Sequence, residues 1–414
     1  GSPTTGTEGT MAVNGNIPGN PIFDASGVND TEITLSTGVT DHITVDLGLD
    51  VTSNADEVYN GGATTSANTT LTVTASDADA IDATTVLTGS TTATDTLTIT
   101  SLATGGTADI DAVTNFDVIN VLDYANGADV TITDNNNGTN GGIPLTINAT
   151  TLDAGEVLTV DTDNFGATAG VTVNAGGGAD IITTGDGADI ISGGAGIDTI
   201  DGTGNATTAA DSINAGAGND IINVTTAETE FSNSSTTALI TDTVDGGAGT
   251  DTLAFAPAVT LTKAELANIS NIETLTLAAT SSITVSDEFL LANPGVSISL
   301  TAGTISAGAG TAADPTATES MTYNHTTGAG AINFKGGTAA DTLNVGGAVF
   351  DATDTIDGGA GTDNINLYNE ATFGTTNTTG DTTTLSLDIN HTNIETITVV
   401  DAATDDHLGD VTIN

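Results

Sequence analysis

A nine-residue repeat constrains the fold of this chain more than any other feature of its sequence. Residues 175–223 read AGGGADIIT, TGDGADIIS and GGAGIDTID, then GTGNATTAADSIN with four extra residues, then AGAGNDIIN. A second patch reads ITDTVD and then GGAGTDTLA, and a third patch contains GGTAADTLN and GGAGTDNIN. An internal repeat predicts that one small structural unit stacks on copies of itself to bury a common core.

Each unit carries an aspartate at the same place, preceded by glycines. Glycine allows positive φ angles and close backbone approach, so a tight turn can point its carbonyl groups inward beside the carboxylate. Oxygen ligands of this kind favour calcium over softer metals. The predicted calcium-binding aspartates are Asp180, Asp189, Asp198, Asp211, Asp220, Asp242, Asp251, Asp341, Asp354 and Asp363. The glycines predicted to shape these sites are Gly176, Gly178, Gly185, Gly187, Gly193, Gly194, Gly196, Gly216, Gly218, Gly246, Gly247, Gly249, Gly336, Gly337, Gly358, Gly359 and Gly361.

The last three positions of each unit are predicted to form a short strand with one inward apolar side chain. Two units would then make one full coil, and calcium would lie between turns on the same side, about eighteen residues apart. This arrangement pairs Asp180 with Asp198, and Asp198 with Asp220 across the insertion. It also predicts one interior ladder of isoleucines, formed by Ile182, Ile191, Ile200, Ile213 and Ile222.

The pattern resembles the RTX (repeats-in-toxin) nonapeptide GGxGxDxUx, in which U is a large apolar residue. The match is full in GGAGIDTID, GGAGTDTLA and GGAGTDNIN, whereas GGTAADTLN has Ala339 where glycine is expected. The resemblance implies a parallel β-roll with calcium between its turns, and type I secretion of an unfolded chain that folds outside the cell. One alternative is a metal-free solenoid in which Asp and Asn hold tight turns. A second is adaptation to high salt, which predicts abundant Glu, yet Asp far outnumbers Glu.

The whole chain is predicted to be all-β: a parallel β-roll or β-solenoid with calcium-binding GGxGxD turns, interspersed strand-rich segments and one or two short helices. The helices are expected from a TKAE capping box at Thr262, with Glu265, and in SDEFLLANPG at 286–295. The segment NIETLTL (271–277) recurs as NIETITV (393–399), and NFDVINV (115–121) is a weaker relative. The predicted divisions are a linker at 1–30, a strand-rich solenoid at 31–170 for which a β-sandwich is the alternative, a calcium β-roll at 171–255, a spacer with short helices at 256–335, a second calcium segment at 336–366 and a strand-rich end at 367–414.

Charge excludes several classes of function. Against 54 acidic residues stand only Lys263 and Lys335, which gives a formal net charge of -52. Nucleic acids and anionic membrane surfaces need basic residues, so we expect neither as a partner. The chain has no cysteine, which excludes a disulfide scaffold or a thiol active site. No apolar run reaches the length of a membrane-spanning helix, and the opening Gly1-Ser2 indicates a fragment of a longer protein.

Other candidate sites are weaker. The segments DTDNFG (161–166) and DNNNGTNGG (134–142) cluster oxygen ligands but lack the Glu that closes an EF-hand loop. The four histidines lie far apart in sequence, and acidic residues are too abundant for any carboxylate pair to indicate a glycosidase. We therefore expect no enzyme activity.

The sequence most resembles RTX-type surface-layer proteins. We expect a secreted, extracellular, calcium-dependent structural protein of a bacterial cell surface that assembles with copies of itself into a lattice. Cell-surface polysaccharide is a second expected partner. The alternatives are the stalk of a large RTX adhesin, and a non-catalytic calcium module of an extracellular enzyme.

Overall fold

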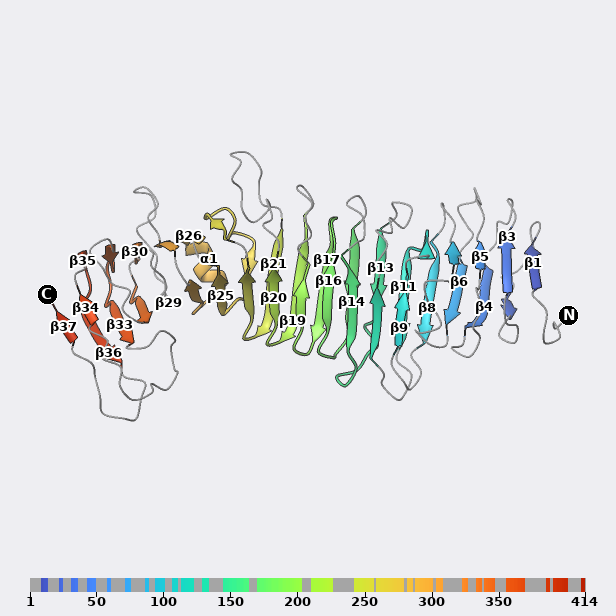
Figure 1. Cartoon of the computed structure of the whole chain (residues 1–414), viewed down its shortest axis with the longest axis horizontal. Helices are drawn as coiled ribbons and strands as arrows, with labels where there is room; N and C mark the ends of the chain where they lie inside the picture. The colour runs from blue at the N-terminus through green and yellow to red at the C-terminus, as the bar shows by residue number, and fades with distance from the viewer. Residues whose placement is uncertain are drawn as a thin grey trace. The chain divides into compact units, whose positions relative to one another are not determined.

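The chain divides into two compact units, Gly1–Asp220 and Ile221–Asn414. The computed structural model (Figure 1) describes residues 9–13, 22–24, 31–35, 43–49, 58–60, 71–75, 86–88, 94–100, 106–110, 113–122, 129–133, 144–163, 170–202, 210–225, 242–256, 258–278, 281–285, 287–300, 303–307, 322–326, 333–336, 339–346, 355–368, 385–387, 390–400 and 411–413. Both units are built almost entirely from short strands, as the alternating β-branched runs predict.

The strands of the first unit are β1 (Gly9–Val13), β2 (Ile22–Asp24), β3 (Thr31–Leu35), β4 (Ile43–Leu49), β5 (Val58–Asn60), β6 (Leu71–Ala75), β7 (Val86–Thr88), β8 (Thr96–Thr100), β9 (Gly106–Asp109), β10 (Val113–Thr114), β11 (Val118–Leu122), β12 (Val130–Thr133), β13 (Leu145–Asn148), β14 (Leu158–Thr162), β15 (Val171–Asn174), β16 (Ile181–Thr184), β17 (Ile190–Ala195), β18 (Thr199–Asp201) and β19 (Ser212–Gly218). Within this unit they hydrogen-bond in the orders β1-β3-β5-β7-β10, β2-β4-β6-β8-β11-β13-β15-β17-β19 and β18-β16-β14-β12-β9. The strand pairings are parallel, and each joins strands of successive coils.

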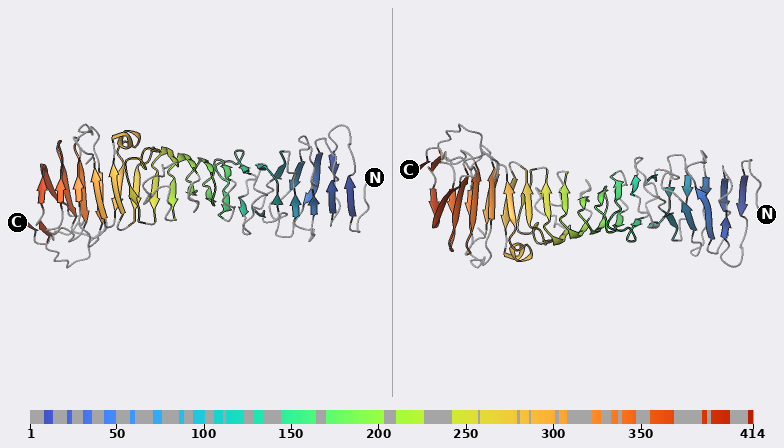
Figure 2. Two further views of the ribbon diagram at one scale, coloured as in Figure 1. Left: turned by 90° about the horizontal axis from the view of Figure 1, so that it is seen from above. Right: turned by 90° about the horizontal axis from the view of Figure 1, so that it is seen from below.

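The second unit contains β20 (Ile221–Val224), β21 (Thr243–Gly249), β22 (Thr252–Phe255), β23 (Thr260–Leu261), β24 (Ile269–Ser270), β25 (Thr274–Leu277), β26 (Ser281–Val285), α1 (Asp287–Ala292), β27 (Ser297–Leu300), β28 (Gly303–Ala307), β29 (Thr322–Thr326), β30 (Asn333–Lys335), β31 (Thr342–Gly346), β32 (Thr355–Asp357), β33 (Asn364–Tyr368), β34 (Leu385–Leu387), β35 (Asn390–Thr392), β36 (Thr396–Val400) and β37 (Val411–Ile413). Its strand orders are β36-β33-β31-β29-β27-β25-β22-β20, β21-β24, β23-β26-β28, β30-β32-β35 and β34-β37. Parallel pairing between successive coils therefore holds in both units, and the fold is a parallel β-solenoid, as predicted (Figure 2).

The core of the first unit consists of apolar rows that run from coil to coil. In one sheet Ile147 pairs with Val173, Val173 with Ile191, and Ile191 with Ile213. These side chains are at most 2% exposed, while their strand neighbours face outward. Burying each isoleucine contributes about 1.5–3 kcal/mol to the stability of the stack.

The expected single ladder of isoleucines is wrong in one respect. Ile182 pairs with Ile200 through β16 and β18, whereas Ile191 pairs with Ile213 through β17 and β19. Ile222, in the second unit, pairs with Leu253. All five are buried, but they belong to two sheets, because consecutive turns send alternate strands to opposite sides of the coil.

The structure also corrects one of the two expected helices. SDEFLLANPG does form α1, which lies beside β24, and Gly295 follows it with a φ of 79°. The segment at Thr262 forms a hydrogen-bonded turn instead, although the N–H of Thr262 does donate to Glu265 as a capping box predicts. Only seven residues separate β23 from β24, too few for a helix and its two ends.

None of the described helical structure is long and apolar enough to cross a membrane.

Candidate metal centre

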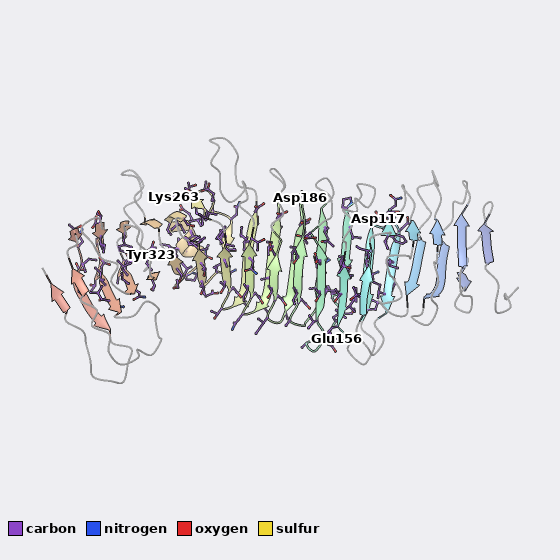
Figure 3. The ribbon with its side chains drawn as sticks, in the orientation of Figure 1. Asp117, Glu156, Asp186, Lys263 and Tyr323 are labelled. Atoms are coloured by element: carbon purple, nitrogen blue, oxygen red, sulfur yellow. The ribbon has the colours of Figure 1, made fainter. Side chains whose placement is uncertain are left out.

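The repeat aspartates of the first unit lie in turns at two edges of the coil. Asp180, Asp198 and Asp220 end the turns that follow β15, β17 and β19. Asp189 ends the turn that follows β16, and Asp211 directly precedes β19. Figure 3 shows the two edges, with Glu156 in a turn at one and Asp186 in a turn at the other. Because successive repeat turns alternate between the two edges, repeats that are eighteen residues apart lie directly beside each other. Across the insertion the separation is twenty-two residues.

Each of these aspartates binds the backbone of the preceding coil. The backbone N–H of Asp180 donates to Oδ1 of Asp198 over 2.8 Å, and the N–H of Asp198 donates to Oδ1 of Asp220 over 2.8 Å. At the other edge the N–H of Asp189 donates to Oδ1 of Asp211, also over 2.8 Å. The pairing predicted from spacing is thus present as a chain of carboxylates that cap one another's backbone. A carboxylate that accepts a backbone N–H satisfies a donor that the turn would otherwise bury.

The second carboxylate oxygen has no such partner in several of these turns. Oδ2 of Asp189, Asp198 and Asp363 is buried and accepts no hydrogen bond. A buried oxygen left without a partner costs about 1–3 kcal/mol, and more when it is charged. Burial raises the pKa of Asp189 to about 6 and that of Asp198 to about 7, where the neighbouring carboxylates of Asp180 and Asp220 add to the effect. These oxygens are placed where a cation would stabilise them.

Two glycines show what the second oxygen faces. A Cβ built on Gly193 would lie 2.5 Å from Oδ2 of Asp198 and 2.4 Å from the carbonyl oxygen of Ala215 in the next coil. On Gly336 it would lie 2.5 Å from Oδ2 of Asp341 and 2.1 Å from the carbonyl oxygen of Gly358. A carboxylate and a carbonyl from successive coils therefore converge beside one glycine. These are the oxygen types that calcium prefers, so the residues present fit that ion.

Backbone carbonyls are a necessary part of such a site. Within the described segments, no three His, Cys, Asp or Glu side chains are grouped so that they alone could hold a metal ion. A repeat turn offers one or two carboxylates, and the rest of a coordination shell must come from the backbone that the glycines expose. Positive φ angles recur at the predicted glycines Gly187, Gly194, Gly196, Gly216, Gly247, Gly249, Gly359 and Gly361.

The structure places most of the predicted site residues in these turns. Asp242 is buried just before β21, Asp251 follows β21, which itself contains Gly246, Gly247 and Gly249, and Asp363 follows the glycine-rich turn after β32. Gly337 and Asp354 lie outside the described residues, as does the segment DNNNGTNGG (134–142). Which of these residues hold an ion stays a prediction. Of DTDNFG, only residues 161–163 are described, and there Oδ1 of Asp161 is buried without a hydrogen bond.

Sequence reasoning missed a further set of acceptors. Oδ2 of Asp117 accepts from the N–H of Asp95, and Oε2 of Glu273 accepts from the N–H of Asp251, each over 2.7 Å. Oε2 of Glu395 accepts from the N–H of Asp363, again over 2.7 Å. All three lie in the recurring NIET or NFDV segments. That recurrence was visible in the sequence, but it did not indicate a contact with the preceding coil.

Fold and turns together define a calcium-binding parallel β-roll. The sequence model of the RTX calcium-binding nonapeptide repeat matches the chain in four copies, at residues 172–200, 201–224, 241–254 and 351–368. These segments are RTX repeats, which bind calcium, and they make this part of the chain a calcium-binding module of the type found in secreted proteins. GGTAADTLN, which contains Ala339, lies outside the matched residues. Neither the curated proteins nor the solved structures include a match to the chain.

Proposed function

We propose that this chain is a secreted structural protein of a bacterial surface layer, which folds and assembles with copies of itself when calcium binds. The observation that carries the proposal is the buried, unpartnered carboxylate oxygen at Asp189, Asp198 and Asp363. Without a cation these charges oppose the stacking of coils, and with one they join neighbouring turns. Folding and calcium binding are then a single equilibrium.

The switch would operate between the inside and the outside of the cell. Inside, where calcium is scarce, a chain of net charge -52 with two lysines repels itself and stays unfolded. Extracellular calcium modules bind with dissociation constants of about 10⁻⁴ to 10⁻³ M, which suits folding after export. The expected secretion route is the type I pathway typical of RTX repeat proteins.

Assembly is supported by the charge of the outward faces. In β14, β16 and β18, Asp161 pairs with Thr183 and Thr183 with Asp201, so β14 and β18 each carry an aspartate at this position and β16 carries a threonine. The chain has almost no basic side chains with which a neighbouring copy could neutralise such a face. Divalent cations shared between two acidic faces would join copies of the chain, and no catalytic role is needed for that function.

Electron microscopy of the purified chain, with excess calcium and with excess EGTA, tests the proposal. We expect ordered sheets in calcium and none in EGTA. Isolated particles in calcium, at every protein concentration that remains soluble, would contradict lattice assembly and favour the stalk of an adhesin. An enzyme module would instead be indicated by a catalytic domain encoded next to this segment.

A further inference from the structure

The two NIET segments each follow the last full repeat of a patch. Residues 246–251 and 358–363 both read GGAGTD, and the next turn at the same edge of the coil is NIET at 271–274 or 393–396. Neither NIET segment falls within the residues matched by the repeat family. Both patches therefore end in the same way, and both lie in the second unit.

The glutamate of NIET takes the place of the next repeat aspartate. Within the third patch, the N–H of Asp341 donates to Oδ1 of Asp363 over 2.7 Å. One coil further on, the N–H of Asp363 donates to Oε2 of Glu395 over the same distance. In the second patch, the N–H of Asp251 donates to Oε2 of Glu273 over 2.7 Å. The carboxylate cap thus continues one coil beyond the last repeat.

The asparagine of NIET takes the place of the next glycine turn. A Cβ on Gly336 would meet the carbonyl oxygen of Gly358 at 2.1 Å, and a Cβ on Gly358 would meet that of Asn393 at 2.0 Å. Asn393 has a φ of 55°, a conformation that asparagine tolerates better than other residues with a side chain. Its Nδ2 donates to Oδ1 of Asp357 over 2.8 Å, which holds the turn in position.

Asn271 repeats this geometry in the second patch. Its φ is 54°, and its Nδ2 donates to Oδ1 of Asp245 over 2.7 Å. A Cβ on Gly246 would lie 2.1 Å from the carbonyl oxygen of Asn271. The same contacts thus recur although 22 residues separate Asp251 from Glu273 and 32 separate Asp363 from Glu395.

A separate observation indicates a ligand at this position. Asp363 is 1% exposed, and its Oδ2 accepts no hydrogen bond. That oxygen would lie 2.7 Å from a Cβ on Gly358, the same point that the carbonyl oxygen of Asn393 approaches. A carboxylate and a carbonyl therefore converge here as they do between two full repeats.

We propose that each NIET segment completes the last calcium site of its patch. The backbone carbonyl of Asn271 or Asn393 replaces the carbonyl of a following glycine turn, and the carboxylate of Glu273 or Glu395 replaces the following aspartate. Each patch then holds one more ion than its repeats alone would define. This inference requires calcium binding by the repeats and is independent of lattice assembly.

The NFDV segment provides the matched control. Asn115 has a φ of 59°, and the N–H of Asp95 donates to Oδ2 of Asp117 over 2.7 Å. The residues before Asp95 read TGSTTAT, with no glycine-rich turn. The same backbone hydrogen bond is present there without the glycine-rich motif of a repeat, so this segment should close a coil and bind no ion.

Isothermal titration with calcium of Glu273→Gln, Glu395→Gln and Asp117→Asn tests the proposal. Glutamine and asparagine keep an oxygen that accepts the backbone hydrogen bond but lose the charge. We expect each glutamine variant to lose one bound ion, or to bind it at least tenfold more weakly. Asp117→Asn should leave both the number of ions and their affinities unchanged. Unchanged binding in both glutamine variants would overturn the proposal.

Circular dichroism in excess calcium shows whether each variant has folded, and the two patches provide independent tests if one variant does not fold.

Discussion

At the scale of single residues, a neutral acceptor can also cap a backbone N–H of the preceding coil. Asn293 is fully buried, and its Oδ1 accepts from the N–H of Ile272 over 2.8 Å. Its Nδ2 donates to the carbonyl oxygens of Ile269 and Phe289. This amide keeps no unpartnered oxygen, whereas Asp198 does. A charge is thus not required to cap a backbone N–H between coils, which supports a second role for the charge of the repeat aspartates in binding a cation.

Replacing Asp198 with alanine should weaken calcium binding more than Asp134→Ala. Asp198 supplies both the cap on the N–H of Asp180 and a free buried oxygen, while Asp134 belongs to no full repeat and lies outside the described residues. Loss of the cap alone should cost about 1–3 kcal/mol of stability. Calorimetric titration measures the binding, and a larger loss in Asp134→Ala would refute the site assignment.

Without calcium, the folded coils should become less stable as the pH rises. Burial raises the pKa of Asp189 to about 6 and of Asp198 to about 7, against an ordinary value of 3.8, so the folded chain binds more protons than the unfolded chain between these limits. The stability that these two protonated carboxyl groups contribute is fully present below about pH 4. It is lost as the pH rises towards 7. The folded fraction of calcium-free protein, followed by far-UV circular dichroism between pH 4 and pH 7, measures the effect and should be lowest at pH 7.

The double variant Asp189→Asn/Asp198→Asn serves as the control for that pH series. It keeps an oxygen at each position but removes two of the titrating groups, so the folded fraction of the calcium-free variant should change less with pH. An equal pH dependence in the variant and the parent would show that other carboxylates dominate.

At the scale of the strands, stability depends on which side chains face into the coil. Ile190 and Ile191 are neighbours in β17, yet Ile191 is 1% exposed and Ile190 is 53% exposed. Ile191→Ala should therefore cost about 2–5 kcal/mol. Ile190→Ala removes the same atoms and should change stability by less than about 0.5 kcal/mol. Chemical denaturation in excess calcium measures both, and equal losses would contradict the assigned register.

Much of the architecture follows from the spacing of the repeat. A turn and a three-residue strand in nine residues predict both the parallel stack and the pairing of Asp180 with Asp198 and Asp220, because two units complete a coil. The spacing does not show which of the two sheets a strand joins. The prediction of one ladder for Ile182 and Ile191 is therefore wrong.

Two other features depended on contacts that local patterns do not encode. The capping box at Thr262 forms, but the neighbouring strands leave no room for a helix. The function of Asn271 and Asn393 requires a positive φ and a partner in another coil. The recurrence of NIET in the sequence indicates neither the positive φ nor the partner in another coil.

At the scale of the whole molecule, both units contain RTX repeats. The matched residues 172–200 lie in the first unit, and 241–254 and 351–368 lie in the second. Neither unit has basic side chains in the number needed to offset its acidic ones, since the chain contains only Lys263 and Lys335. Calcium is therefore the expected counter-charge in both, and its removal should affect the chain throughout.

The most direct test of this account is far-UV circular dichroism of the chain in calcium and after addition of excess EGTA. In calcium we expect the spectrum of a β protein. After chelation the buried repeat carboxylates lose their counter-charge, and the spectrum should become that of a largely disordered chain, with recovery when calcium is restored. A β spectrum unchanged by excess EGTA would contradict the claim that calcium holds these coils together.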